Sequence, residues 1–249
     1  MKKLISTLML SVFVFGIFTV NANALSISSV HPEDDTGSYL IKIKDTTEST
    51  KVKVAYNDNV YTYDLVEGDN YIPLQFGDGE YTFTIFENIK ANIYKKVGFK
   101  RVNVENNENP FLSNNMIIDD SKAKETIGKV SKLITKEMTD NEKISTIYNF
   151  VVESLSYDFV KDQYKINTNI DETFNSGTGS SYDYALSTVV LLRHFNIPAK
   201  LVIGNHTDCE TPCAWVEVLI NNKYRVIDPM YERTEIFQPS KNYETQIFY

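Results

Sequence analysis

The fold of this chain is decided between Gly177 and Asp228, in four short pieces of sequence. The first piece leads into a run whose apolar residues recur at helical spacing, and the later pieces are short, apolar and separated by turn residues. This order predicts a helix followed by antiparallel strands, which is an α+β arrangement. The pieces read Gly-Thr-Gly-Ser-Ser-Tyr-Asp-Tyr-Ala (177–185), Ile-Pro-Ala-Lys-Leu-Val-Ile-Gly (197–204), Cys-Ala-Trp-Val-Glu-Val (213–218) and Val-Ile-Asp-Pro (226–229).

The order and spacing of these pieces resemble the transglutaminase-like superfamily, whose fold is shared with papain-like thiol enzymes. The family pattern is roughly Gly-x-Gly-x-Cys-x-Asp-Tyr-Ala, Gly-Ile-Pro-Ala-Arg, His-Ala-Trp-x-Glu-Val and Asp-Pro-Thr, with Cys, His and Asp as the catalytic triad. Tyr-Asp-Phe at 157–159 resembles a Tyr-Asp-Tyr often found between the family's helices. The resemblance covers about residues 108–231 and implies helices packed on an antiparallel sheet.

Two of the three triad groups that the resemblance implies are absent. The nucleophile position holds Ser181, the His position holds Cys213, and only Asp228 matches the family. In the family, a helix N-terminus and a facing imidazolium lower the pKa of the thiol, so that it is ionised at neutral pH. A serine hydroxyl instead needs a proton acceptor, and a neutral thiol is a poor one. The degenerate triad therefore predicts a protein without the family's catalysis.

Two substitutes for the missing base are open. His206 precedes the Cys213 strand, and it is either a recruited base or a solvated loop residue. The alternative makes Cys213 the nucleophile with His206 as base, although a nearby carboxylate raises a thiol pKa. His194 lies about 20 Å along a helix from Ser181, which is too far. Trp215 is expected to pack beside the cleft, and Asp183 and Tyr184 to form structural hydrogen bonds, as retained parts of the family signature.

The only cysteines, Cys209 and Cys213, are four positions apart. In an exported protein such a pair is a candidate disulfide closing a small loop at Pro212. Two free thiols are the equal alternative, because an extended segment would hold the Cα atoms too far apart. No further Cys or His set has metal-ligand spacing, so neither a metal nor another cofactor is expected.

The N-terminus has the layout of a secretory signal peptide. Lys2 and Lys3 precede an apolar run that ends in Ala-Asn-Ala at 22–24, so residues 1–24 are expected to be cleaved. An uncleaved membrane anchor is the competing interpretation. Cleavage would remove two lysines and no acid, leaving 23 Lys and Arg against 33 Asp and Glu, a net charge of −10. We expect no later membrane span, and a chain this acidic is a poor nucleic-acid binder.

Residues 25–107 are expected to form an antiparallel, immunoglobulin-like β-sandwich. Alternating apolar and polar residues mark strands at 39–44, 51–56, 60–65 and 81–86. Lys95-Lys96 and Lys100-Arg101 form the one basic cluster, read either as a contact for an anionic wall or lipid or as a solvated strand face. An Asn-rich linker at 105–115 then leads into a transglutaminase-like domain at 116–249.

Three helices are expected in this second domain. Asp119 and Asp120 cap an apolar stripe that runs from Ala123 to Met138, and Asp140 caps a second helix. The third helix spans about 181–195 and stops before Pro198, whereas residues 161–179 are expected to be a loop. Strands follow at 199–203, 214–220 and 224–227, with a tight turn at 221–222.

The sequence thus predicts a secreted or cell-surface pseudoenzyme of the transglutaminase-like superfamily. We expect its cleft to bind a peptide, a cell-wall component or a protein without cleaving it. Two rival hypotheses remain: an active papain-like peptidase or acyl transferase with an altered triad, and a non-catalytic adhesive or structural protein. The sequence identifies neither the ligand nor the oligomeric state.

Overall fold

The computed structural model describes residues 26–30, 37–44, 49–105, 109–158, 169–207, 211–230 and 242–249. Two compact units make up the chain. The first holds mainly residues Tyr39–Ile72 and Phe76–Asn107, and the second Glu108–Tyr249 with two short pieces at Thr36–Ser38 and Pro73–Gln75. The predicted signal peptide at 1–24 lies outside the described residues.

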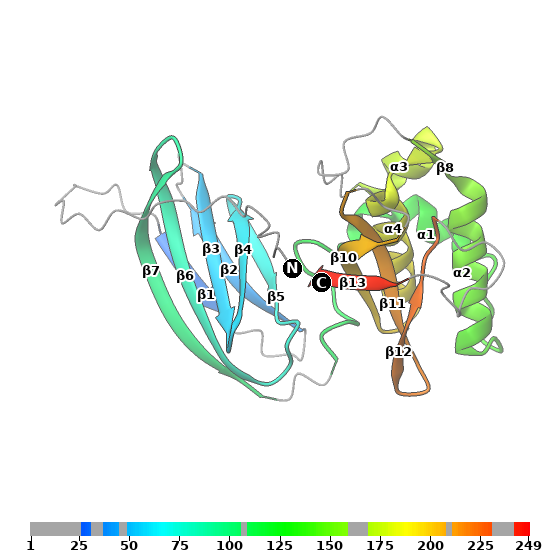
Figure 1. Cartoon of the computed structure of the whole chain (residues 1–249), viewed down its shortest axis with the longest axis horizontal. Coiled ribbons are helices and arrows are strands. Elements are labelled where there is room, and N and C mark those ends of the chain that lie inside the picture. Colours follow the sequence, from blue (N-terminus) through cyan, green and yellow to red (C-terminus); the bar gives the residue numbers. More distant parts are fainter. Residues whose placement is uncertain are drawn as a thin grey trace. The chain divides into compact units, whose positions relative to one another are not determined.

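The first unit contains two β-sheets (Figure 1). One has the strand order β1-β2-β5 and the other the order β4-β3-β6-β7. The predicted strands are present, and β6 extends beyond its predicted bounds. The bounds are β1 Ser26–Val30, β2 Ser38–Lys44, β3 Thr50–Tyr56, β4 Asn59–Leu65, β5 Gly68–Pro73, β6 Gly79–Lys90 and β7 Ile93–Val104.

Alternation along these strands builds a core between the sheets. Val52, Val54, Tyr81 and Phe83 are buried, whereas the residues between them are half-buried or exposed. The ring of Tyr39 in β2 stacks on Phe83 in β6 at 4.4 Å between centroids, so the two sheets share this core. Antiparallel sheets are therefore present as predicted, and their immunoglobulin-like identity stays a prediction.

The second unit begins with helices that differ from the predicted ones. A 3₁₀ turn η1 (Asp120–Lys122) precedes α1 (Lys124–Val130), which ends eight residues before Met138. The prediction of one helix from Ala123 to Met138 is wrong, because the chain turns after Val130: the amide of Leu133 bonds the Val130 carbonyl in an i→i+3 pattern. The helix α2 (Asp140–Ser154) then starts at a capping box of Thr139 and Glu142.

The predicted loop at 161–179 is partly wrong, because its last part contains a helix. The helix α3 (Ile170–Ser176) starts at the N-cap Asn169 and ends at Gly177, which has a φ of 68°. Ile170 and Thr173 are buried and anchor it. Residues 161–168 of this prediction lie outside the described residues. Two short strands, β8 (Ser156–Tyr157) and β9 (Thr178–Gly179), then pair in parallel before the third predicted helix.

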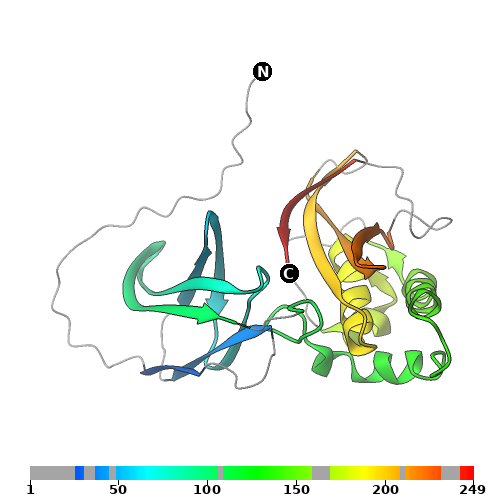
Figure 2. The same ribbon diagram turned by 90° about the horizontal axis from the view of Figure 1, so that it is seen from below.

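That helix, α4 (Ser181–His194), lies against one face of an antiparallel sheet ordered β12-β11-β10-β13 (Figure 2). Buried residues of α2, α4, β10 and β11 form one apolar core. The predicted turn at 221–222 is confirmed, with positive φ at both Asn221 and Asn222. The strand bounds are β10 Ala199–His206, β11 Cys213–Ile220, β12 Lys223–Ile227 and β13 Tyr243–Phe248. The second unit is thus a mixed helix and antiparallel-sheet fold.

Arg193 at the end of α4 joins three segments of this unit. It is 3% exposed, and its guanidinium donates to the main-chain oxygens of Ala199, Ser113 and Tyr249 at 2.8–2.9 Å. Burial lowers the pKa of Arg193 to about 9, so the side chain stays charged at neutral pH and all three bonds are charge-assisted.

No helix within the described ranges is long and apolar enough to span a bilayer.

Candidate functional site

The N-terminus of α4 is held by a buried capping box. Ser180 is the N-cap; its amide and hydroxyl both donate to Oδ2 of Asp183, at 2.7 and 2.8 Å, and its hydroxyl accepts from the Asp183 amide. Both side chains are at most 3% exposed. Asp183 therefore has a structural role at the helix start, where its charge is also favoured by the helix dipole.

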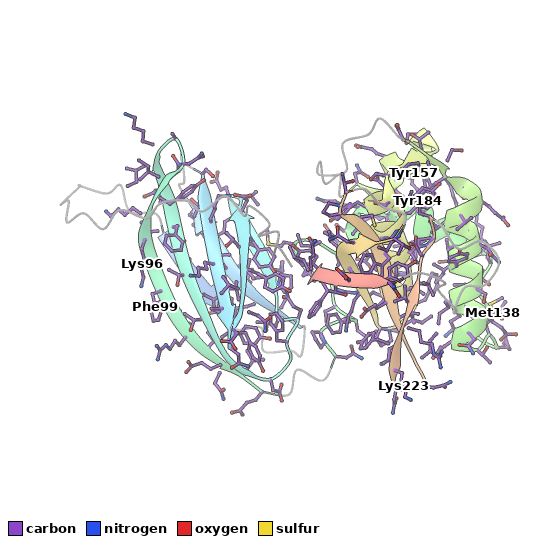
Figure 3. The ribbon with its side chains drawn as sticks, viewed as in Figure 1. Lys96, Phe99, Met138, Tyr157, Tyr184 and Lys223 are labelled. Carbon is purple, nitrogen blue, oxygen red and sulfur yellow. The ribbon has the colours of Figure 1, made fainter. Side chains whose placement is uncertain are left out.

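A second signature residue, Tyr184, ties this helix to the end of α2. Its hydroxyl donates to the main-chain oxygen of Leu155 at 2.6 Å, and its ring is 2% exposed. Tyr184 and Tyr157, a residue of β8, are both labelled in Figure 3. The capping box and this bond together fix where α4 begins, and hence where its first residue lies.

That first residue is Ser181, which is 2% exposed. Its Oγ accepts a hydrogen bond from the main-chain amide of Ala214, in β11, at 3.3 Å. Within the part of the chain that the structure describes, this is the only hydrogen bond of the Ser181 side chain. The predicted nucleophile position therefore lies beside the start of β11, and no imidazole among the described residues is hydrogen-bonded to it.

Cys213, the predicted His position, is the first residue of β11 and directly precedes Ala214. It is disulfide-bonded and 4% exposed, and it packs with Val202 and Trp215. The sequence contains one other cysteine, Cys209, which lies outside the described residues. A disulfide sulfur carries neither a proton nor a thiolate charge, so Cys213 supplies neither a base nor a nucleophile in this state.

Asp228 directly follows β12 and is 1% exposed. Oδ2 accepts a hydrogen bond from the hydroxyl of Tyr243 in β13 at 3.0 Å, and Oδ1 accepts one from the amide of Met230 at 3.1 Å. The main-chain oxygen of Asp228 accepts from the hydroxyl of Tyr148 in α2 at 3.4 Å. These contacts hold the one retained triad carboxylate in a fixed position inside the protein.

The structure brings His206 to this carboxylate. Its Nε2 lies 3.8 Å from Oδ2 of Asp228, and both side chains are 1% exposed. The expectation of a solvated loop residue is wrong, because β10 continues through His206 and the rings of Tyr243 and Trp215 pack on the imidazole at 5.1 and 6.5 Å. At 3.8 Å the pair is an ion-pair contact when His206 is protonated, and it is longer than a hydrogen bond.

Trp215 packs against the rings of His206 and Tyr243, next to Asp228. It is fully buried, its ring contacts that of Tyr243 at 4.9 Å, and its Nε1 finds no acceptor among the described residues. The close approach depends on Gly204, because a Cβ there would lie 2.7 Å from Cη2 of Trp215 and 2.1 Å from the main-chain oxygen of Glu244. The expected packing role of Trp215 thus extends to supporting Tyr243 beside Asp228.

Two polar contacts of this site have no counterpart among the sequence-predicted residues. Tyr243 is part of the site because β13 pairs with β10, which places Tyr243 opposite His206. Tyr148 lies on α2, and its hydroxyl reaches the main-chain oxygen of Asp228. His194, the distant histidine, is instead paired with Asp120 at 2.9 Å.

The arrangement holds an aspartate, an imidazole and a tyrosine hydroxyl together, with a serine hydroxyl bonded to neighbouring main chain. In acyl transfer the nucleophile is hydrogen-bonded to its base, and among the described residues the hydrogen bond to Ser181 Oγ comes from the Ala214 amide. In the described segments no three His, Cys, Asp or Glu side chains converge as a metal site would require.

Three solved structures similar to this chain are distant likenesses. A candidate cysteine protease from Cytophaga hutchinsonii has a TM-score of 0.44 at 13% identity, covering 82% of this chain and 80% of that one. A TGase has a TM-score of 0.36 at 15% identity, covering 44% and 31%. A candidate protease from Parabacteroides distasonis has a TM-score of 0.32 at 18% identity, covering 42% and 23%. At these values no residue role is carried over.

Comparison by sequence was more decisive in one region. A search of curated proteins gave no match. The family model of the transglutaminase-like superfamily, however, matches residues 128–229, which include α2, α4, Ser181, Cys213 and Asp228. Residues 128–229 of this chain are therefore a transglutaminase-like superfamily domain.

Proposed function

We propose that this protein is a non-catalytic, exported member of the transglutaminase-like superfamily that binds an extended peptide segment. The observation that carries the proposal is the hydrogen bonding of Ser181: its Oγ accepts from the amide of Ala214 and meets no base within the described chain. The family's His position is occupied by Cys213, which is disulfide-bonded. With no base bonded to Ser181 and no thiol at position 213, the site lacks the groups for acyl transfer.

The retained frame supports a binding role. The capping box at Ser180, the bond from Tyr184 to Leu155 and the bonds around Asp228 keep the site elements in place without serving chemistry. A peptide is the ligand that the family resemblance favours, either the stem peptide of a cell wall or an extended stretch of a protein. The immunoglobulin-like interpretation of the first unit and the removal of residues 1–24 belong to the same proposal.

Restoring the triad tests the loss of catalysis. The triple variant Ser181→Cys, Cys213→His, Cys209→Ser puts a thiol at the helix N-terminus, a histidine one residue before Ala214 and no stray cysteine. We expect peptide hydrolysis or amine incorporation by this variant and none by the wild type, assayed on fluorogenic peptides and on dansylcadaverine with casein. The control is Cys209→Ser with Cys213→Ser, which removes the bridge without adding a base. Wild-type turnover that Ser181→Ala abolishes would contradict the proposal.

The binding role has its own assay. Mature protein would be titrated with peptidoglycan fragments solubilised by a muramidase, with and without their stem peptides, and with reduced, alkylated lysozyme as an extended protein. Binding that requires the stem peptide or the extended protein supports the proposal. Binding to neither refutes the ligand class.

His206 favours a second candidate function, an active enzyme with an altered triad. Its Nε2 lies 3.8 Å from Oδ2 of Asp228, where the carboxylate would stabilise a protonated imidazole. In that case wild-type turnover would depend on both Ser181 and His206, so His206→Gln joins Ser181→Ala in the assay. Loss of turnover in both variants would establish this alternative.

A further inference from the structure

The four-stranded sheet of the first unit has one solvent-facing side, which we call the outer face. Register places its residues in rows across the strands: Thr62, Lys53, Thr84 and Phe99 form one row, and Asp64, Lys51, Phe86 and Lys96 form the next. Arg101 follows opposite Thr82. The opposite side of the same strands carries the buried residues of the core, among them Val52, Val54, Phe83 and Val102.

Cations predominate on this face although the chain as a whole has a net charge of −8. Lys51 is paired with Asp64, and Arg101 lies 3.9 Å from Glu80. Lys53 and Lys96 have no acidic partner among the described residues, and both are exposed. The face is therefore a local positive region on an acidic protein, and such a region attracts polyanions.

Protection of an edge strand does not account for these cations. Lysines on an edge strand discourage pairing with other chains, and β7 is an edge of its sheet. Lys51 and Lys53, however, lie on β3, which is paired on both sides by β4 and β6. Edge protection therefore does not explain Lys51 and Lys53.

The face also carries an exposed aromatic ring. Phe99 is 53% exposed, with the Lys96 ammonium 4.3 Å and the Arg101 guanidinium 5.8 Å from its ring centroid. Lys96 and Phe99 are labelled along β7 in Figure 3. Such cation–π packing holds charged groups around an apolar platform. Hydroxyls of Thr62, Thr82 and Thr84 lie in the rows beside it and offer hydrogen bonds in both senses.

We propose that the outer face binds an anionic polysaccharide. Its cations match the sulfate, phosphate or carboxylate groups of such a polymer, its threonines match sugar hydroxyls, and Phe99 offers a surface for the apolar face of a sugar ring. A lipid surface fits less well, because the face has no broad apolar stripe to insert. The site lies outside the transglutaminase-like domain, so it goes beyond the function proposed for Ser181 and its neighbours.

The full chain would be titrated with dextran sulfate, neutral dextran of equal length, polyphosphate and phosphatidylglycerol vesicles at several salt concentrations. We expect salt-dependent binding of dextran sulfate and none of neutral dextran. Lys53→Gln with Lys96→Gln should weaken it by about tenfold and flatten the salt dependence, and Phe99→Ala should weaken it by about fivefold. The charge-matched control is Lys136→Gln with Lys223→Gln, two exposed lysines of the second unit.

Each other outcome overturns the proposal. Equal weakening by the control pair would mean that net charge alone attracts the polymer. Polyphosphate bound as tightly as dextran sulfate, or no effect of Phe99→Ala, would remove the sugar from the recognition. Tighter binding to the vesicles would make the face a membrane contact. None of these results depends on Ser181, so they are separate from the assays of the transglutaminase-like domain.

Discussion

Tyr182, the residue after Ser181, is a buried tyrosine of α4. Tyr182 is 4% exposed, and its Oη has no hydrogen-bond partner among the residues that the structure describes. A buried hydroxyl without a partner loses its bonds to water and gains none in return. We predict that Tyr182→Phe raises the free energy of unfolding by about 1 kcal/mol at pH 7, measured by urea denaturation. A clear loss of stability would show that the hydroxyl is bonded in solution.

Arg193 differs from Tyr182, because its buried guanidinium donates hydrogen bonds to three main-chain oxygens. Arg193→Met keeps much of the side-chain volume and leaves all three carbonyls without this donor. We predict a loss of about 3 kcal/mol in the free energy of unfolding, since each unsatisfied buried acceptor costs of order 1 kcal/mol or more. Arg225, exposed on β12, is the matched control, and Arg225→Met should change stability by less than about 0.5 kcal/mol. Similar losses in both variants would contradict this role.

At the scale of elements, two glycines in the second unit should respond to the same substitution in opposite directions. A Cβ on Gly204 would lie 2.1 Å from the main-chain oxygen of Glu244, so β13 would have to separate from β10. A Cβ on Gly128, inside α1, meets nothing within 4 Å.

We predict that Gly204→Ala costs about 2 kcal/mol or more through strain and lost strand pairing, whereas Gly128→Ala adds up to about 1 kcal/mol through helix propensity. Urea denaturation of both variants measures the difference. Because Tyr243 is in β13, Gly204→Ala should also alter the near-ultraviolet circular dichroism of the Trp215 cluster. Equal effects at the two positions would contradict the close packing of β13.

Local signals made most elements of the second unit predictable. The helix α4 follows from its N-cap serine, its apolar spacing and Pro198, and the hairpin of β11 and β12 from two adjacent asparagines. The error after Val130 arose because apolar spacing continues to Met138, although the Thr139–Glu142 capping box already signals a new helix start. The sequence also contains local signals for α3, because Asn169 is a suitable N-cap and Gly177 a suitable end of the helix.

The contacts of the site were less predictable, because they depend on long-range pairing. The pairing of β13 with β10 brings Tyr243 opposite His206 and close to Asp228, and no local pattern around residue 243 indicates this. The burial of His206 depends on the same pairing. Sequence therefore points to Ser181, Cys213 and Asp228 through the family motif, but not to the tyrosines that surround the carboxylate.

On the scale of the whole molecule, buried tyrosines make both units sensitive to alkaline pH. Burial raises the pKa of Tyr81 in the first unit and of Tyr182 in the second, and it raises the pKa of Tyr224 to about 12 against an opposing effect of Arg193. Each of these tyrosines stays neutral in the folded protein above pH 10, where an unfolded tyrosine ionises. Their contribution to stability is therefore complete below pH 10 and is lost as pH rises.

We predict that the free energy of unfolding falls as pH rises from 10 to 12, by at most about 1.4 kcal/mol per pH unit for Tyr182. Arg193 acts in the opposite direction. Burial lowers its pKa in the folded protein to about 9, so above this pH the unfolded chain binds more protons and the contribution of Arg193 to stability rises with pH. Comparison of variants isolates the tyrosines: the fall should be shallower in Tyr182→Phe and in Tyr224→Phe than in the wild type, by urea denaturation at pH 8, 10 and 11. Exposed Tyr71 serves as control, and Tyr71→Phe should leave the slope unchanged. Parallel slopes in all four proteins would mean that these tyrosines ionise alike in the folded and unfolded chain.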